Sequence, residues 1–182
     1  MRRLSQARTQ PKPFGRRQDD TGWCQTDDTR WCQTDDTRWC QTGDVSRVVV
    51  LPSGARVRGR RIFDDPDADP DPDFLLALTQ GPLRPWPCRR INWPDFWIPI
   101  DRADALDALD ETLRRARAGQ AVEVACRGGR GRTGTALAAL AVLDGMPANL
   151  AVRWVRDNYD PKAVETPWQA WWVRTIPCPR RP

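Results

Sequence analysis

The 182-residue chain contains no histidine, only two lysines, and no long apolar run. Without histidine and without a Cys-x-x-Cys pair, the common zinc-site spacings are missing, so neither a metal site nor a cofactor is expected. No run approaches the roughly 20 apolar residues that span a bilayer, so stable membrane insertion is not expected. The basic N-terminus lacks the apolar segment of a secretory signal, which makes the cytoplasm the expected location.

The charge of the chain gives no sign of a nucleic-acid partner. The formal net charge is +5, from 29 Lys and Arg against 24 Asp and Glu. The arginines are scattered and form no basic helix or aromatic-interleaved patch, so nucleic acid is not a predicted partner. The preference for Arg over Lys suits GC-rich coding in an actinobacterium-like source. The six cysteines form no disulfide framework, since three belong to a repeat and the others lie far apart; reduced thiols are expected.

Residues 1–45 differ from the rest of the chain. An eight-residue unit with Trp and Cys at its centre occurs three times, at 19–26, 27–34 and 35–42. Its near-identical, polar copies have no amphipathic period and predict a disordered extension, or translated sequence upstream of the true start. The alternative is a Trp-Cys array that binds a partner or a soft metal. At the other end, 177–182 is interpreted as a basic, Pro-rich tail.

Residues 46–176 predict one compact α/β domain, with a central, mainly parallel sheet flanked by helices. Hydrophobic periodicity and turn residues indicate the individual elements. The expected elements are a hairpin at 48–51 and 55–59, a short helix at 74–78, a Pro-containing loop at 81–90, a helix at 101–118, a strand at 122–124, and helices at 135–143, 148–158 and 166–173.

The most informative segment is the Gly-rich one at 126–134, which begins with Cys126 and has Arg132 after five intervening residues. It lies between the expected strand and a helix, which predicts a loop whose backbone N–H groups point at a single anion. A helix N-terminus stabilises a thiolate, and a guanidinium can hold a phosphate through two parallel hydrogen bonds. The segment therefore indicates a nucleophile directed at a bound phosphate.

Two further segments complete the pattern: Trp93-Pro94-Asp95 upstream, and Thr166-Pro167-Trp168-Gln169 downstream. With them, residues 46–176 resemble the cysteine-dependent protein tyrosine phosphatases. The compact size resembles a dual-specificity-like bacterial member of that family. The five tryptophans at 93, 97, 168, 171 and 172 are expected to be core and loop-anchor residues.

The resemblance implies a metal-independent hydrolase that forms a phosphocysteine intermediate. In that scheme Cys126 attacks phosphorus, and Asp95 acts as general acid and then as base. Arg132 and the backbone of the loop hold the phosphate oxygens. The resemblance also implies that Thr133 stabilises the leaving sulfur and that Gln169 positions water. The expected substrate-binding residues are Arg127, Gly128, Gly129, Arg130 and Gly131.

Two departures from the family pattern leave alternatives open. Ala125 stands where the family usually has His, which is expected to weaken the support of the loop and lower activity or shift it to higher pH. Glu165 stands where tyrosine-specific members have a first Gln. Arg127 and Arg130 resemble the cationic positions of lipid phosphatases. A phosphorylated protein is the expected substrate; the alternatives are a phosphoinositide or other polyphosphate, and a catalytically inactive phosphate-binding module.

Overall fold

The computed structural model describes residues 23–25, 31–33, 47–64, 71–82 and 84–178. Its main feature is a five-stranded sheet with the order β3-β4-β7-β5-β6. β3 pairs antiparallel with β4, and the other neighbours are parallel, as predicted for a mainly parallel sheet. The strands are β3 (Val48–Val50), β4 (Arg56–Arg61), β5 (Phe74–Ala77), β6 (Cys88–Arg90) and β7 (Val122–Cys126).

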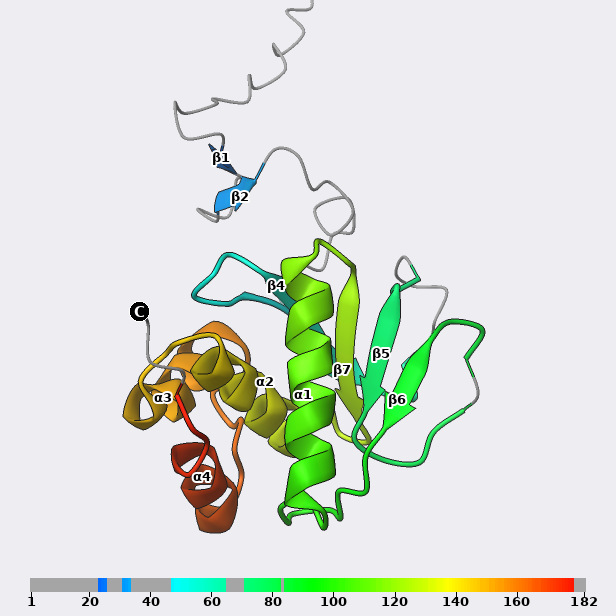
Figure 1. Ribbon diagram of the computed structural model, residues 1–182, viewed down its shortest axis with the longest axis vertical. Coiled ribbons are helices and arrows are strands. Elements are labelled where there is room, and N and C mark those ends of the chain that lie inside the picture. Colours follow the sequence, from blue (N-terminus) through cyan, green and yellow to red (C-terminus); the bar gives the residue numbers. More distant parts are fainter. Residues whose placement is uncertain (1–22, 26–30, 34–46, 65–70, 83, 179–182) are drawn as a thin grey trace, which may run out of the picture.

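Four helices share one hydrophobic core with one face of this sheet. Figure 1 shows α1 in front of the sheet and alongside β7, with α2, α3 and α4 gathered beside it. Residues of all four helices pack in the same cluster as Val57, Leu76, Val122 and Val124 of the central strands. The helices are α1 (Arg102–Arg117), α2 (Gly131–Leu143), α3 (Ala148–Asn158) and α4 (Pro167–Arg174).

The opposite face of the sheet is partly apolar and partly charged. Successive side chains of a strand alternate between faces, so Glu123 and Ala125 of β7 point away from the helices. Ala125 packs with Ile62, Leu75 and Ala77 in a second, smaller cluster. Beside it, the fully buried Glu123 accepts a hydrogen bond from Arg58 Nε at 2.5 Å. β7 is therefore buried on both faces, which fixes its position at the centre of the sheet.

Several expected elements are confirmed. The hairpin forms with its turn at 51–55, and α1 begins at the N-cap Asp101, whose side chain accepts a hydrogen bond from Asp104 N at 3.0 Å. α4 begins with a capping box, in which the Thr166 side chain and the Gln169 side chain each bond to the other residue's backbone. These local signals account for the accuracy of these two predicted helix starts, whereas α2, predicted from 135, begins at Gly131.

Two expectations in the middle of the chain are wrong. The predicted short helix at 74–78 is instead β5, an inner strand between β7 and β6. The predicted loop at 81–90 ends in β6, which pairs in parallel with β5. A short apolar run has no period that separates a buried strand from a buried helix. Burial of all four β5 residues on both faces of the sheet selects the strand.

The predicted extension at 1–45 contributes two short described strands, β1 (Trp23–Gln25) and β2 (Trp31–Gln33). They pair antiparallel with Cys24 opposite Cys32. The rest of that prediction, and residues 179–182 of the predicted tail, lie outside the described ranges. In the part of the chain that the structure describes, every helix is too short or too polar to cross a membrane.

Candidate active site

Cys126 is the last residue of β7, at the carboxyl edge of the sheet where parallel α/β folds place their ligands. Its side chain belongs to the main core, and the residue is 2 % exposed. The chain then turns through 127–130 into α2, which begins at Gly131. Residues 126–132, called here the phosphate loop, therefore join a buried strand directly to a helix N-terminus, as the sequence predicts.

Arg132 connects this loop to two other segments. Its side chain is only 4 % exposed, and Nη2 lies 2.9 Å from Asp95 Oδ1. Nη1 donates to the carbonyl oxygens of Trp93 at 2.9 Å and Leu78 at 3.3 Å. Among the described residues, its buried Nε has no hydrogen-bond partner. Such a buried donor in a native site needs an explanation, and a bound anion supplies one.

Asp95 lies in a turn, residues 93–97, called here the Asp95 loop. Trp93 is buried against Trp172 of α4, with ring centroids 5.1 Å apart in an edge-to-face arrangement. Trp93 Nε1 donates to the Trp97 carbonyl at 2.7 Å, which closes the turn around Asp95. The Asp95 side chain remains 56 % exposed, so it faces both Arg132 and solvent.

The start of α4 holds the far side of the Asp95 loop. Trp168 Nε1 donates to the Phe96 carbonyl, and the Trp168 and Trp97 rings lie 5.3 Å apart. Phe96 has a φ of 55°, a strained conformation for a bulky residue that surrounding contacts must maintain. The expectation that these tryptophans anchor the core and the loop is therefore confirmed for Trp93, Trp97, Trp168 and Trp172, while Trp171 is exposed.

Gln169 contacts the Asp95 loop, although it does not line the cavity beside Arg132. It is fully buried, and its Oε1 accepts hydrogen bonds from Glu165 N at 2.9 Å and Thr166 N at 3.3 Å. Its Nε2 donates to the Trp97 carbonyl at 3.2 Å. The Gln169 amide thus caps α4 and binds the Asp95 loop.

Glycines allow the phosphate loop to pack tightly against its surroundings. Gly129 has a φ of 63°, and a Cβ there would lie 2.8 Å from the backbone nitrogen of Arg61. At Gly134, one turn into α2, a Cβ would lie 2.5 Å from the Cβ of Ala163. Real Cβ atoms do not approach so closely, so both positions require glycine for the loop and helix to sit where they do.

Tyr159, the only tyrosine of the chain, contacts the phosphate loop and supports it. Its hydroxyl donates to the Gly129 carbonyl, and its ring packs where a Cβ on Gly59 would clash. Burial, and secondarily the nearby Cys126, raise the pKa of Tyr159 above its ordinary value, so the hydroxyl stays protonated and remains a donor. Sequence reasoning missed this residue.

We therefore expect Tyr159→Phe to lower the melting temperature by a few degrees, because about 1 kcal/mol of hydrogen bonding is lost while the ring is kept. We also expect kcat/KM for p-nitrophenyl phosphate to fall several-fold, because the loop expected to hold the phosphate loses a support. Thermal unfolding and steady-state kinetics measure the two effects. A lower melting temperature with unchanged kcat/KM would make the contact purely structural.

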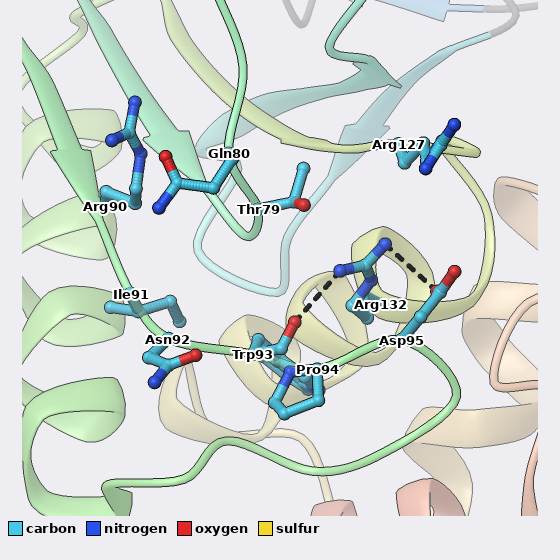
Figure 2. Close-up of a pocket in the computed structure, with 10 residues that line it drawn as sticks. All are labelled: Thr79, Gln80, Arg90, Ile91, Asn92, Trp93, Pro94, Asp95, Arg127 and Arg132. Atoms are coloured by element: carbon cyan, nitrogen blue, oxygen red, sulfur yellow. Dashed lines mark hydrogen bonds and ion pairs between the residues drawn. The ribbon is translucent and has the colours of Figure 1, made fainter.

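A cavity of about 560 Å³ opens beside these residues. Figure 2 shows Arg127, Arg132 and Asp95 at one end of it, and Arg90, Gln80 and Asn92 at the other. Arg130, expected to act together with Arg127, points elsewhere: its Nε lies 3.0 Å from Asp160 Oδ2, and it lines a second pocket of about 350 Å³. The two loop arginines therefore do not converge on one ligand.

No protein-family model and no curated protein matches the sequence. Solved structures do match. Tk-PTP in its active form is 24 % identical, with a TM-score of 0.57, over 66 % of this chain and 89 % of that chain. Human DUSP28 is 19 % identical, with a TM-score of 0.54, over 71 % of this chain and 90 % of that chain. This chain has the fold of the tyrosine and dual-specificity phosphatases.

Within that fold, the position before Cys126 is an apolar site in this chain. Ala125 is buried in the second cluster beside Ile62, Leu75 and Ala77, with Trp86 packed against them. A histidine ring is much larger than this alanine side chain, so the buried cluster would have to rearrange to admit it. The support of the phosphate loop comes instead from Tyr159, on the other side.

Thr133 is the last of the expected site residues. Thr133 is fully buried at the start of α2, and its Oγ1 has no hydrogen-bond partner among the described residues. Its hydroxyl is therefore available to a group bound in the loop. Across the described ranges, no three His, Cys, Asp or Glu side chains lie close enough together to hold a metal ion.

Proposed function

We propose that this chain is a phosphomonoester hydrolase that acts through a phosphocysteine intermediate. The observation that carries the proposal is the contact between Arg132 and Asp95, whose side chains lie 2.9 Å apart. It brings together two motifs separated by more than thirty residues, and Arg132 belongs to the same loop as Cys126. A phosphate-binding cation, an exposed carboxylic acid and a thiol at a helix N-terminus are the groups that this chemistry requires.

In the first step, the Cys126 thiolate attacks phosphorus and the bond to the leaving oxygen breaks. Asp95 gives its proton to that oxygen, which leaves as an alcohol or phenol. Arg132 and the backbone N–H groups of 127–132, including Gly128, Gly129 and Gly131, hold the other phosphate oxygens. The half-exposed side chain of Asp95 suits this role, because it is reachable from solvent while anchored by Arg132.

In the second step, water attacks the phosphocysteine and Asp95 accepts its proton. The sulfur–phosphorus bond breaks, and inorganic phosphate leaves with the thiolate restored. The Thr133 hydroxyl stabilises the leaving sulfur. Gln169 contributes through the Trp97 carbonyl, by keeping Asp95 in a position to activate the water. No redox partner or metal takes part in either step.

A phosphorylated protein, with phosphotyrosine or mixed phosphoresidues, is the proposed substrate class. A phosphoinositide remains a second candidate because Arg127 lines the same cavity as Arg132. The contact of Arg130 with Asp160 weakens that candidate, because a ring with several phosphates needs convergent cations. A thiolate nucleophile requires a reducing compartment, so the cytoplasm is the proposed location.

The test is hydrolysis of p-nitrophenyl phosphate, phosphotyrosine peptides and phosphoinositides by the full chain in the presence of a chelator. A covalent phosphoenzyme trapped by rapid acid quench, and mapped to Cys126 by mass spectrometry, would support the proposed intermediate. An inactive chain that still binds vanadate would instead indicate a phosphate-binding module without catalysis.

A further inference from the structure

The cavity extends well beyond the phosphate loop, and its far end carries a cation that sequence reasoning did not select. Arg90 is the last residue of β6 and pairs in register with Ala77 of β5, which in turn pairs with Ala125. Arg90 therefore lies in the same row across the sheet as the residue before Cys126, two strands away. Two strand spacings correspond to roughly 10 Å.

Among the described residues, the charge of Arg90 has no carboxylate partner, unlike the charge of Arg89. Arg89, on the other side of the strand, lies within 3.2 Å of three acidic side chains of α1. These contacts, with the hydrogen bond to Asp104 first, raise the pKa of Arg89. Within the described ranges, Arg90 and Arg127 form no ion pair. Of the four charged residues that line the cavity, Asp95 alone is acidic, so the lining has a formal charge of +2 from three arginines and one aspartate.

We infer that Arg90 binds a second anionic group of the substrate, at a distance from the phosphate that is hydrolysed. This inference rests on the proposed function. The ligand is an acidic side chain of a phosphopeptide, a carboxylate or a second phosphate, within about three residues of the scissile phosphoresidue, since an extended chain advances roughly 3.4 Å per residue. Arg90 is thus a specificity-determining residue.

The lining of the cavity favours an extended peptide over a compact polyphosphate. The amides of Gln80 and Asn92 lie at the Arg90 end, where they can bond to a peptide backbone. The two unpaired cations are also divided between opposite ends of the cavity (Figure 2), whereas the phosphates of one ring would need them together. A chain of residues can bridge the two ends.

The experiment measures peptide binding without turnover, in the Cys126→Ser background. Fluorescein-labelled phosphotyrosine peptides carry Gln, Glu or phosphoserine at one flanking position, scanned from one to three residues away on each side. Fluorescence anisotropy gives Kd for Cys126→Ser alone and for the same protein with Arg90→Gln. A matched control is Arg114→Gln, which removes an equal charge from the exposed surface of α1 near its C-terminus.

We expect at least one Glu or phosphoserine peptide to bind about tenfold more tightly than its Gln counterpart, which corresponds to one charge-assisted hydrogen-bond contact. Arg90→Gln should bring that ratio close to one, and Arg114→Gln should leave it unchanged. If the phosphoserine peptide binds more tightly than the Glu peptide, the ligand of Arg90 is a second phosphate. If the two peptides have equal Kd values, Arg90 binds any anionic side chain.

Three results would overturn the inference: equal binding of all peptides, an acidic preference that survives Arg90→Gln, or tighter Arg90-dependent binding of phosphoinositide vesicles. Hydrolysis of p-nitrophenyl phosphate by the wild-type chain, measured in parallel, tests the proposed function separately. If the wild-type chain is inactive but still prefers acidic peptides in an Arg90-dependent way, the proposed hydrolase activity is refuted and the proposed anion site at Arg90 stands.

Discussion

Cys126→Ser is expected to reduce hydrolysis of p-nitrophenyl phosphate by about four orders of magnitude or more, because the proposed reaction has no other nucleophile. A serine hydroxyl is far less ionised than a thiol, so phosphorus would face a neutral oxygen in place of a thiolate. The substitution changes one atom of a buried side chain. The fold should therefore survive, and vanadate should still bind. Steady-state rates and a vanadate titration by thermal shift measure both.

Cys88→Ser is the matched control, since Cys88 is an exposed, free cysteine on β6. Partial desolvation of the sulfur raises the pKa of the Cys88 thiol, which makes it a poor nucleophile near neutral pH. Its replacement should leave turnover intact. Retention of most activity in Cys126→Ser, or its loss in Cys88→Ser, would contradict the assignment of the nucleophile.

The segments that sequence predicted best are those in which local chemistry alone determines the structure. A strand, a Gly-rich turn and an Ala-rich helix specify the phosphate loop within a few residues, because Gly129 and Gly134 allow approaches that no other residue allows. The helix starts at Asp101 and Thr166 are likewise local, since each cap bonds within its own first turn. The prediction for residues 74–78 was wrong because pairing with the neighbouring strands, and not the hydrophobic period of the segment itself, makes it the strand β5.

The residues of the site likewise differ in whether local sequence or distant contacts identify them. Cys126, Arg132 and Asp95 carry motif chemistry, so their types and order were enough to select them. Tyr159 acts through a backbone carbonyl 30 residues away, and no local pattern marks such a contact. Arg90 was hidden because the segment around it was predicted as loop. Only the register of β6 with β5 places it in the row of Ala125.

The contacts around the Asp95 loop indicate that Asp95, the proposed general acid, is held in place before substrate binds. Arg132 contacts Asp95 from inside, while Trp168 and Gln169 hold the carbonyls of the next two residues from outside. A loop fixed on both sides keeps its carboxylate close to where the leaving oxygen must lie. Such preorganisation lowers the cost of reaching the transition state.

Asp95→Asn then tests the acid itself. Asparagine keeps the shape of the side chain but cannot supply a proton, so kcat on a phosphotyrosine peptide should fall by a factor of about 10² to 10⁴. The fall should be smaller on p-nitrophenyl phosphate, because nitrophenolate is a stable anion that leaves with little need for a proton. Stability should change little, because the Asp95 side chain is 56 % exposed and such contacts contribute little.

The test is the ratio between the fall in rate on the phosphotyrosine peptide and the fall on p-nitrophenyl phosphate, so both substrates are measured on the same preparations. Asp110→Asn is the matched control, because it removes an exposed carboxylate of α1 that lies 3.5 Å from Arg114 Nε. It should leave both rates unchanged. If Asp95→Asn lowers both substrates equally, Asp95 serves to orient Arg132 and does not donate a proton to the leaving group. A negligible loss on the peptide would remove Asp95 from the reaction altogether, and another group lining the cavity would have to protonate the leaving oxygen.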